Sequence, residues 1–116
     1  SVRDKALAVV LDPGGLDPVE FAGEAGKEDI PLLLSCLVSL FRDVAVLGLG
    51  YRESPGNPDL SDRLAGAAGT WSHEAAVQAI DETFRTGAAI SANANKRLAL
   101  EVLLMKLQAL ADGGYN

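Results

Sequence analysis

Apolar residues recur every three or four positions along most of the chain, which is the spacing of one face of an α-helix. The alternation typical of a strand does not persist over any segment. Helices are expected at about 3–11, 18–26, 30–48, 59–68, 72–92 and 95–111. The pattern therefore predicts an all-α fold, a compact bundle of about five to six helices.

Cap and turn residues separate these segments. Asp17, Asp29, Ser72 and Asn95 each precede an apolar periodic stretch, and their short polar side chains are suited to accept from the first free backbone N–H groups. The Pro-Gly-rich stretches at 12–15 and 54–58 are typical of turns. The boundaries of the predicted helices rest mainly on these signals.

The segment at 30–48 is apolar on nearly every side, which is typical of a helix surrounded by other helices. We expect it at the centre, packed by the helices near 72–92 and 95–111. Adjacent charges at Arg42 and Asp43 argue against a membrane span. Two such charges must reach solvent, pair, or meet another chain, and we favour a narrow solvent-facing edge over a contact with a partner.

The two long carboxyl-terminal helices each show an apolar face. In the first, Trp71 precedes the cap as a possible anchor on the first turn. The residues expected to be buried there are Val77, Ile80, Phe84 and Ala88. Those expected to form the apolar face of the last helix are Leu100, Leu103, Leu104, Leu107 and Leu110.

Charge and composition narrow the classes of function. The net charge of −6 disfavours direct binding of nucleic acid or an anionic membrane. One cysteine forms no internal disulfide and suits a reducing compartment, so we expect a cytoplasmic protein. The first residues lack the apolar core of a signal peptide. Since the chain begins with Ser1 and not Met, we expect a segment of a larger protein with a residual tag serine.

The inventory of reactive residues offers no catalytic, cofactor or metal site. His73 has no second imidazole to share a zinc ion, and it is expected to be an exposed first-turn residue. Cys36 lies among leucines and is expected to be a core residue. The phosphate-binding loop G-x-x-x-x-G-K-[ST] is absent from the sequence. We therefore expect no enzymatic activity in this segment and no cofactor.

The residues at 93–107 read NANKRLALEVLLMKL, which resembles a segment of the collar domains of bacterial DNA polymerase III clamp loaders. Arg42-Asp43 resembles a pair on the long helix of the delta-prime collar, and Asn57-Pro58-Asp59-Leu60 is similar to the loop that follows it. Lys96 departs from the pattern, because many relatives have proline there. The resemblance extends over about 30–110, and the gamma/tau collar is the close alternative.

This resemblance implies a subunit-assembly domain that packs against the other clamp-loader subunits, gamma/tau and delta. It divides the chain into a linker with short helices at 1–29, a collar-like region at 30–112 and a frayed tail at 113–116, within one structural domain. ATP binding and most DNA contacts would belong to the upstream modules of the parent protein, a subunit of the DNA polymerase III holoenzyme. The isolated domain need not associate with itself.

A possible interface follows from the last helix. Leu98, Val102 and Met105 fall off its main apolar face, and they form either a second face for a neighbour or more of the domain's own core. The candidate interface residues are Arg42, Asp43, Arg97, Leu98, Val102, Met105 and Lys106.

Two other classes of function stay open. A helical adaptor that binds a peptide or helix in a groove would need an exposed apolar patch. A small-molecule-binding or enzymatic bundle would need an apolar pocket with convergent polar groups, for which the sequence offers no obvious set.

Overall fold

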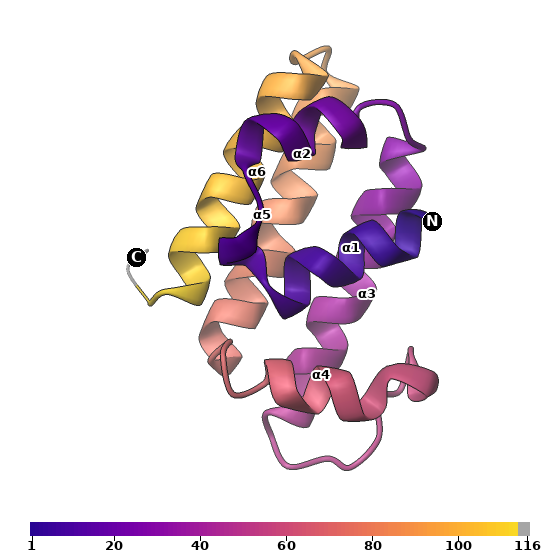
Figure 1. Cartoon of the computed structure of the whole chain (residues 1–116), viewed down its shortest axis with the longest axis vertical. Coiled ribbons are helices and arrows are strands. Elements are labelled where there is room, and N and C mark those ends of the chain that lie inside the picture. The colour runs from indigo at the N-terminus through magenta and orange to yellow at the C-terminus, as the bar shows by residue number, and fades with distance from the viewer. Residues whose placement is uncertain (114–116) are drawn as a thin grey trace.

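A computed structural model describes residues 1–113, and all regular structure in this range is helical, with none of these residues in a strand (Figure 1). The long helices are joined by short turns and by one longer connection at 48–57. The elements are α1 (Val2–Leu11), α2 (Pro18–Ala25), α3 (Ile30–Leu47), α4 (Ser61–Ala67), α5 (His73–Ser91) and α6 (Lys96–Ala111), with 3₁₀ turns at Pro13–Gly15 and Pro58–Leu60. The predicted all-α class is confirmed.

The four predicted caps each accept a hydrogen bond from a backbone N–H three residues ahead. The carboxylates of Asp17 and Asp29 lie 3.1 Å from their donors. The corresponding distances are 3.0 Å for the Ser72 hydroxyl and 2.9 Å for the Asn95 side-chain carbonyl. Each cap satisfies an N–H that the helix itself leaves unpaired, so these local signals fix where the helices begin.

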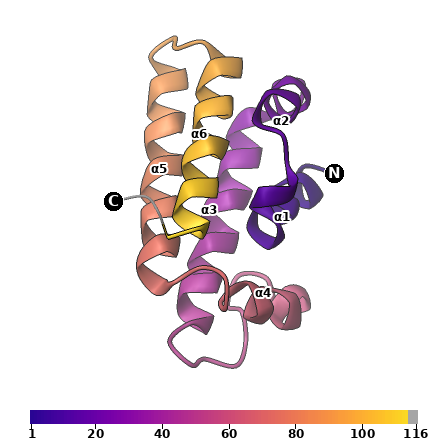
Figure 2. The same ribbon diagram turned by 60° about the vertical axis from the view of Figure 1, so that its left-hand side comes forward.

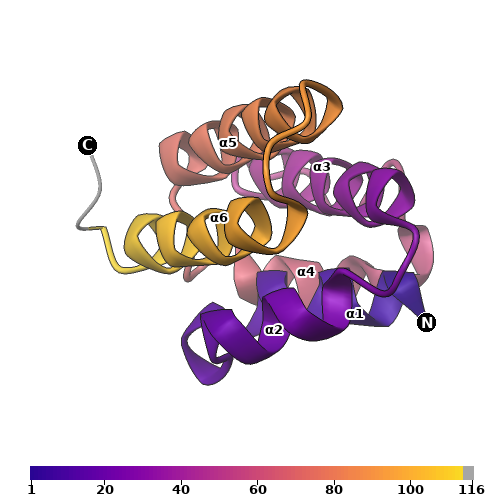
Figure 3. The ribbon, with the colours of Figure 1, turned by 90° about the horizontal axis from the view of Figure 1, so that it is seen from above.

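The helices lie in three layers when seen from above (Figure 3). α5 forms one outer layer, α3 and α6 the middle, and α1, α2 and α4 the other outer layer. α5 packs against both α3 and α6, whereas α1 packs on α3 and α2 packs on α6. A view from the side shows α5, α6 and α3 next to one another, with α1 and α2 beyond them (Figure 2).

The core fills the space between the middle helices and their covers. Its largest aliphatic contributions come from leucines of α3 and α6, and small residues of α1 and α2 close it from the far side. These leucines are Leu33, Leu37 and Leu40 on α3, and Leu100, Leu103, Leu104 and Leu107 on α6. The apolar face predicted for the last helix is therefore confirmed.

α3 is long and apolar enough, by length and composition, to cross a membrane, yet 56% of it is buried inside the bundle. That burial is typical of a core helix in a soluble protein. The helix is less enclosed than its sequence suggested, because Leu32, Ser35 and Arg42 are exposed along one side. Cys36 is half-buried at the edge of the core, although we expected a core position.

The buried face of α5 differs from the predicted one. Val77, Phe84 and Ala88 are exposed and Ile80 is only half-buried, whereas Ala75, Ala76, Ala79 and Thr83 face the interior together with Glu82. Because α5 must approach both α3 and α6, small side chains suit the contact better than large ones. The prediction followed the largest apolar residues and was wrong for this reason.

Trp71 acts as an anchor between distant parts of the chain. Its indole is buried, packs edge-on against Phe41 with ring centroids 4.7 Å apart, and donates a hydrogen bond of 2.8 Å from Nε1 to the carbonyl of Val10. The ring thus joins α1, α3 and the start of α5, a wider role than packing on its own helix.

The first 29 residues are packed parts of the domain. α1 covers α3, α2 covers α6, and the Gln108 amide of α6 donates to the carbonyls of Pro13 (2.9 Å) and Leu16 (2.8 Å). The sequence led us to expect a linker with short helices in this region, within one structural domain, and the two helices are present. Of the expected tail, Gly113 has a positive φ of 75° after the last helix, and 114–116 lie outside the described residues.

Replacing Trp71 with Phe should destabilise the fold by about 2 kcal/mol, because the Val10 carbonyl loses its buried donor and the smaller ring leaves a void. Urea unfolding followed by circular dichroism measures this loss. Tyr51→Phe is the matched control, because Tyr51 is exposed. Equal midpoints for the two variants would contradict the anchoring role.

Candidate assembly interface

α6 carries two apolar faces, one buried and one exposed. Leu98, Val102 and Met105 are 57%, 39% and 53% exposed, although all three are large apolar side chains. Their spacing of four and then three residues places them in one row along the helix. Of the two alternatives for these residues, burial in the domain's own core is therefore excluded for the chain as described.

This exposed row borders a groove between α5 and α6. The groove has a volume of about 360 Å³, and Leu98, Val102 and Lys106 line it from α6. Thr86 and Ala89 line it from α5. A side chain of another protein could therefore pack between the two helices and not only against a flat surface.

One of the two basic side chains near the row, that of Lys106, forms an ion pair within the chain. Lys106 places its ammonium nitrogen 3.0 Å from a carboxylate oxygen of Glu82, whose side chain is only 8% exposed. This pair joins α6 to α5, so the Lys106 charge is already paired within the domain. Arg97 is exposed, and its guanidinium reaches α2 at Gly23, where an added Cβ would lie 3.0 Å from it.

Arg42 and Asp43 point in different directions. Arg42 is exposed, as expected for a solvent-facing edge, whereas Asp43 is completely buried. The Asp43 carboxylate accepts from the Ser54 hydroxyl, from the Gly56 N–H at 3.1 Å and from the Asn57 amide at 2.8 Å. The favoured solvent-facing edge and the contact with a neighbouring subunit are therefore both corrected for Asp43. Its carboxylate anchors the 48–57 connection, because a buried carboxylate needs donors.

The anchored connection continues to the amino-terminal helix. Asn57 accepts a hydrogen bond of 3.1 Å from the guanidinium of Arg3, and Arg3 also holds Asp59 through two hydrogen bonds of 2.8 Å. Sequence reasoning did not single out Arg3 for any role. Its contacts lie 54 and 56 positions away along the chain, so helical periodicity carries no signal for them.

The contact between Arg3 and Asp59 shifts the pKa of both side chains. The hydrogen bonds from Arg3 lower the pKa of Asp59, and the same contact raises the pKa of Arg3. Both groups lie at the surface, so solvent screens the pair and its contribution to stability is small.

His73 is exposed in the first turn of α5, as predicted, with its Nδ1 3.1 Å from the carbonyl of Ala45. Within residues 1–113, no three His, Cys, Asp or Glu side chains come together in a way that could hold a metal ion.

Comparison of the chain with models of protein families, with curated proteins and with solved structures found no match in any of the three.

Replacing Asp43 with Ala should cost about 3 kcal/mol, because several donors around the carboxylate lose their acceptor in a buried place. Amide hydrogen exchange at Gly56 should accelerate in parallel with the loss measured by urea unfolding. Asp62→Ala on the exposed side of α4 is the control and should change neither. Similar losses in both variants would show that Asp43 has no special anchoring role.

Replacing Arg3 with Ala should raise the pKa of Asp59 toward its ordinary value, which carboxyl NMR titration measures. Because the folded-state pKa of Asp59 is lowered, its stabilising effect is present above the unfolded pKa and is lost as pH falls through the folded pKa. The difference in free energy of unfolding between the unmodified protein and the Arg3→Ala variant should therefore become smaller as the pH is lowered. Arg63→Ala should leave the Asp59 titration unchanged, and a shift there would contradict the pairing.

Proposed function

We propose that this chain is a subunit-assembly domain of a bacterial DNA polymerase III clamp loader, of the collar type found in the delta-prime subunit. The observation that carries the proposal is the exposed row Leu98, Val102 and Met105 on α6. The row lies within the same segment, 93–107, on which the resemblance to collar domains is strongest.

The energetics of the row favour contact with another protein. Each large apolar side chain moved out of water contributes about 1.5–3 kcal/mol when it is fully buried. Three such residues along two turns, next to a groove, offer the core of an interface that polar residues could surround. Covering the row by a neighbouring subunit would therefore be favourable without any change in the fold.

The distribution of charge fits protein contact better than contact with DNA. The chain carries a net charge of −6, and the Lys106 ammonium is paired with Glu82. Arg97 is the exposed basic residue of the candidate set on α6. This surface therefore fits assembly with another protein through apolar contact, with Arg97 at its edge, better than it fits binding of DNA. Partners would be gamma/tau and delta, and chemistry would occur elsewhere in the assembly.

Delta-prime is preferred over gamma/tau because of the connection after α3. Asp43 and Asn57 belong to two segments that separately resemble the delta-prime collar, and their side chains meet at 2.8 Å. Two resembling segments that form one structural unit support each other more than two isolated matches. The sequence preceding the chain in its full-length protein provides an independent test. An intact phosphate-binding loop there would favour gamma/tau, and degenerate loops with a Ser-Arg-Cys motif would favour delta-prime.

Replacing Leu98 and Met105 together with Glu should weaken assembly with gamma/tau and delta by about 100-fold, because two charges would have to be buried in an apolar contact. Co-purification followed by analytical ultracentrifugation measures the complex. Leu49→Glu, an exposed leucine after α3, is the matched control. Failure of the unmodified protein to join those subunits would refute the clamp-loader proposal. Normal assembly of the double variant would refute only this surface.

A further inference from the structure

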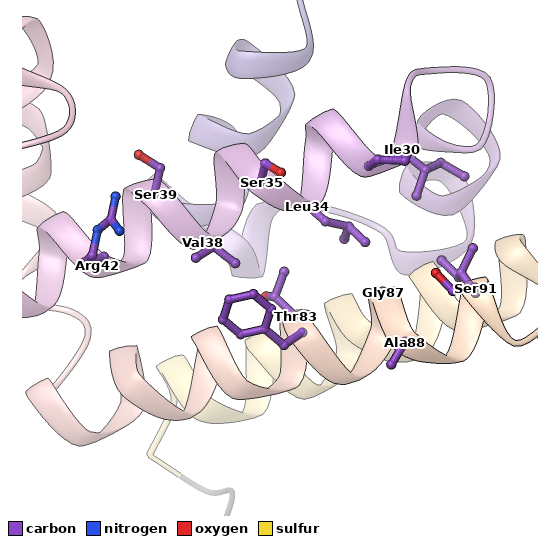
Figure 4. A pocket seen from close by; sticks show the side chains of 13 residues that line it. Ile30, Leu34, Ser35, Val38, Ser39, Arg42, Thr83, Gly87, Ala88 and Ser91 are labelled. Atoms are coloured by element: carbon purple, nitrogen blue, oxygen red, sulfur yellow. The ribbon is translucent and has the colours of Figure 1, made fainter.

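A second groove lies on the other side of α5, between α5 and α3. Its volume is about 520 Å³, and it is the larger of the two grooves beside α5. Leu34 and Val38 of α3 point toward α5 within it (Figure 4). Phe84 lines it from α5 and is 62% exposed. The groove thus combines an apolar floor with an aromatic side chain that nothing in the described chain covers.

The groove is open because of the way α5 packs. Small side chains such as Thr83 and Gly87 face α3, and a Cβ added at Gly87 would lie 3.4 Å from the Leu34 side chain. This close approach leaves the bulky Phe84 outside the core. An exposed Phe is common on protein surfaces, but one beside an apolar groove is a ready contact point, because aromatic side chains bury large areas on binding.

The dimensions of the groove fit one helix. On α3 its lining extends from Ile30 to Arg42, a distance of about 18 Å at the rise of an α-helix. That length corresponds to about three helical turns. Contact along a narrow channel between two parallel ridges is how an amphipathic helix binds a groove, with anchors at positions i, i+4 and i+7.

Charge distinguishes the two ends. Arg42 lies at one end, and Ile30 and Ser91 lie at the other (Figure 4). Arg42 is the charged residue among those that line the groove. No ion pair joins it to any residue of the described range 1–113, although the chain as a whole is acidic. An acidic residue at this end would complement the guanidinium, and an acidic first turn also stabilises a helix through its dipole.

We propose that the α3–α5 groove binds an amphipathic helix of about three turns, whose apolar face covers Phe84 and Val38 and whose acidic first turn meets Arg42. The bound helix would then run antiparallel to α3, since its amino-terminal end lies beside the carboxyl-terminal half of α3. This binding uses a different surface from the α6 row. It therefore adds a second partner to the assembly role and does not depend on it.

Selection of 14-residue peptides from a displayed random library against the immobilised 116-residue chain tests this proposal. The selected peptides should carry apolar residues at helical spacing and Asp or Glu in the first turn. Their affinity, measured by fluorescence anisotropy, should fall about tenfold with Phe84→Ala and about tenfold with Arg42→Glu. Exposed residues outside the groove provide matched controls: Val77→Ala on α5 and Arg63→Glu on α4 should leave affinity within about twofold.

Three results would overturn the proposal. One is a selection that yields no helical peptide, and another is an equal loss of affinity in test and control variants. The third is self-association of the unmodified chain that Phe84→Ala abolishes, because the occupant would then be a second copy and not a short helix. Circular dichroism of each variant verifies that the fold is retained. Assembly with clamp-loader subunits is measured separately, so either proposal can fail without the other.

Discussion

The packing of α5 on both α3 and α6 is the constraint from which the two grooves and the exposed Phe84 follow. One helix can approach two others closely only if its inner side is lined with small residues, and Ala76, Ala79 and Thr83 meet this need. The large residues of α5 are then displaced outward, and a groove opens on each of its sides. The Glu82–Lys106 pair closes the α5–α6 contact, where the buried carboxylate requires a partner.

A polar cluster around Asp43 constrains the structure near the carboxyl-terminal end of α3. The 48–57 connection has no regular structure of its own, and the carboxylate of Asp43 accepts hydrogen bonds that water would otherwise accept from it. Asn57, one of these donors, also accepts a hydrogen bond from Arg3. Every donor around this carboxylate finds its acceptor inside the domain. A residue that looked like a possible contact with a neighbour therefore belongs to the folding of a single chain, whereas its neighbour Arg42 is exposed at the end of the α3–α5 groove.

Local signals in the sequence predicted the helices well, because a cap acts on the backbone within one turn. Asp29 and Asn95 are examples, and both begin their helices as expected. The buried face of α5 was missed because the prediction placed the largest apolar residues inside. The close approach of α5 to α3 and α6 instead requires small side chains at the contact. The partners of Asp43 and Arg3 were missed because they come from distant positions. Of the candidate interface, Leu98, Val102 and Met105 are exposed as an interface requires, and only spatial structure could show it.

The long-range hydrogen bonds of the amino-terminal segment bear on the order in which the chain can fold during synthesis. Gln108 holds the carbonyls of Pro13 and Leu16, and Trp71 holds that of Val10, across separations of 95, 92 and 61 positions. α1 can pack on α3 soon after both have been synthesised, whereas α2 gains its partner only when α6 emerges. Until then the side of α2 that packs on α6 stays uncovered, and exposed apolar surface of this kind makes an incomplete chain prone to aggregate.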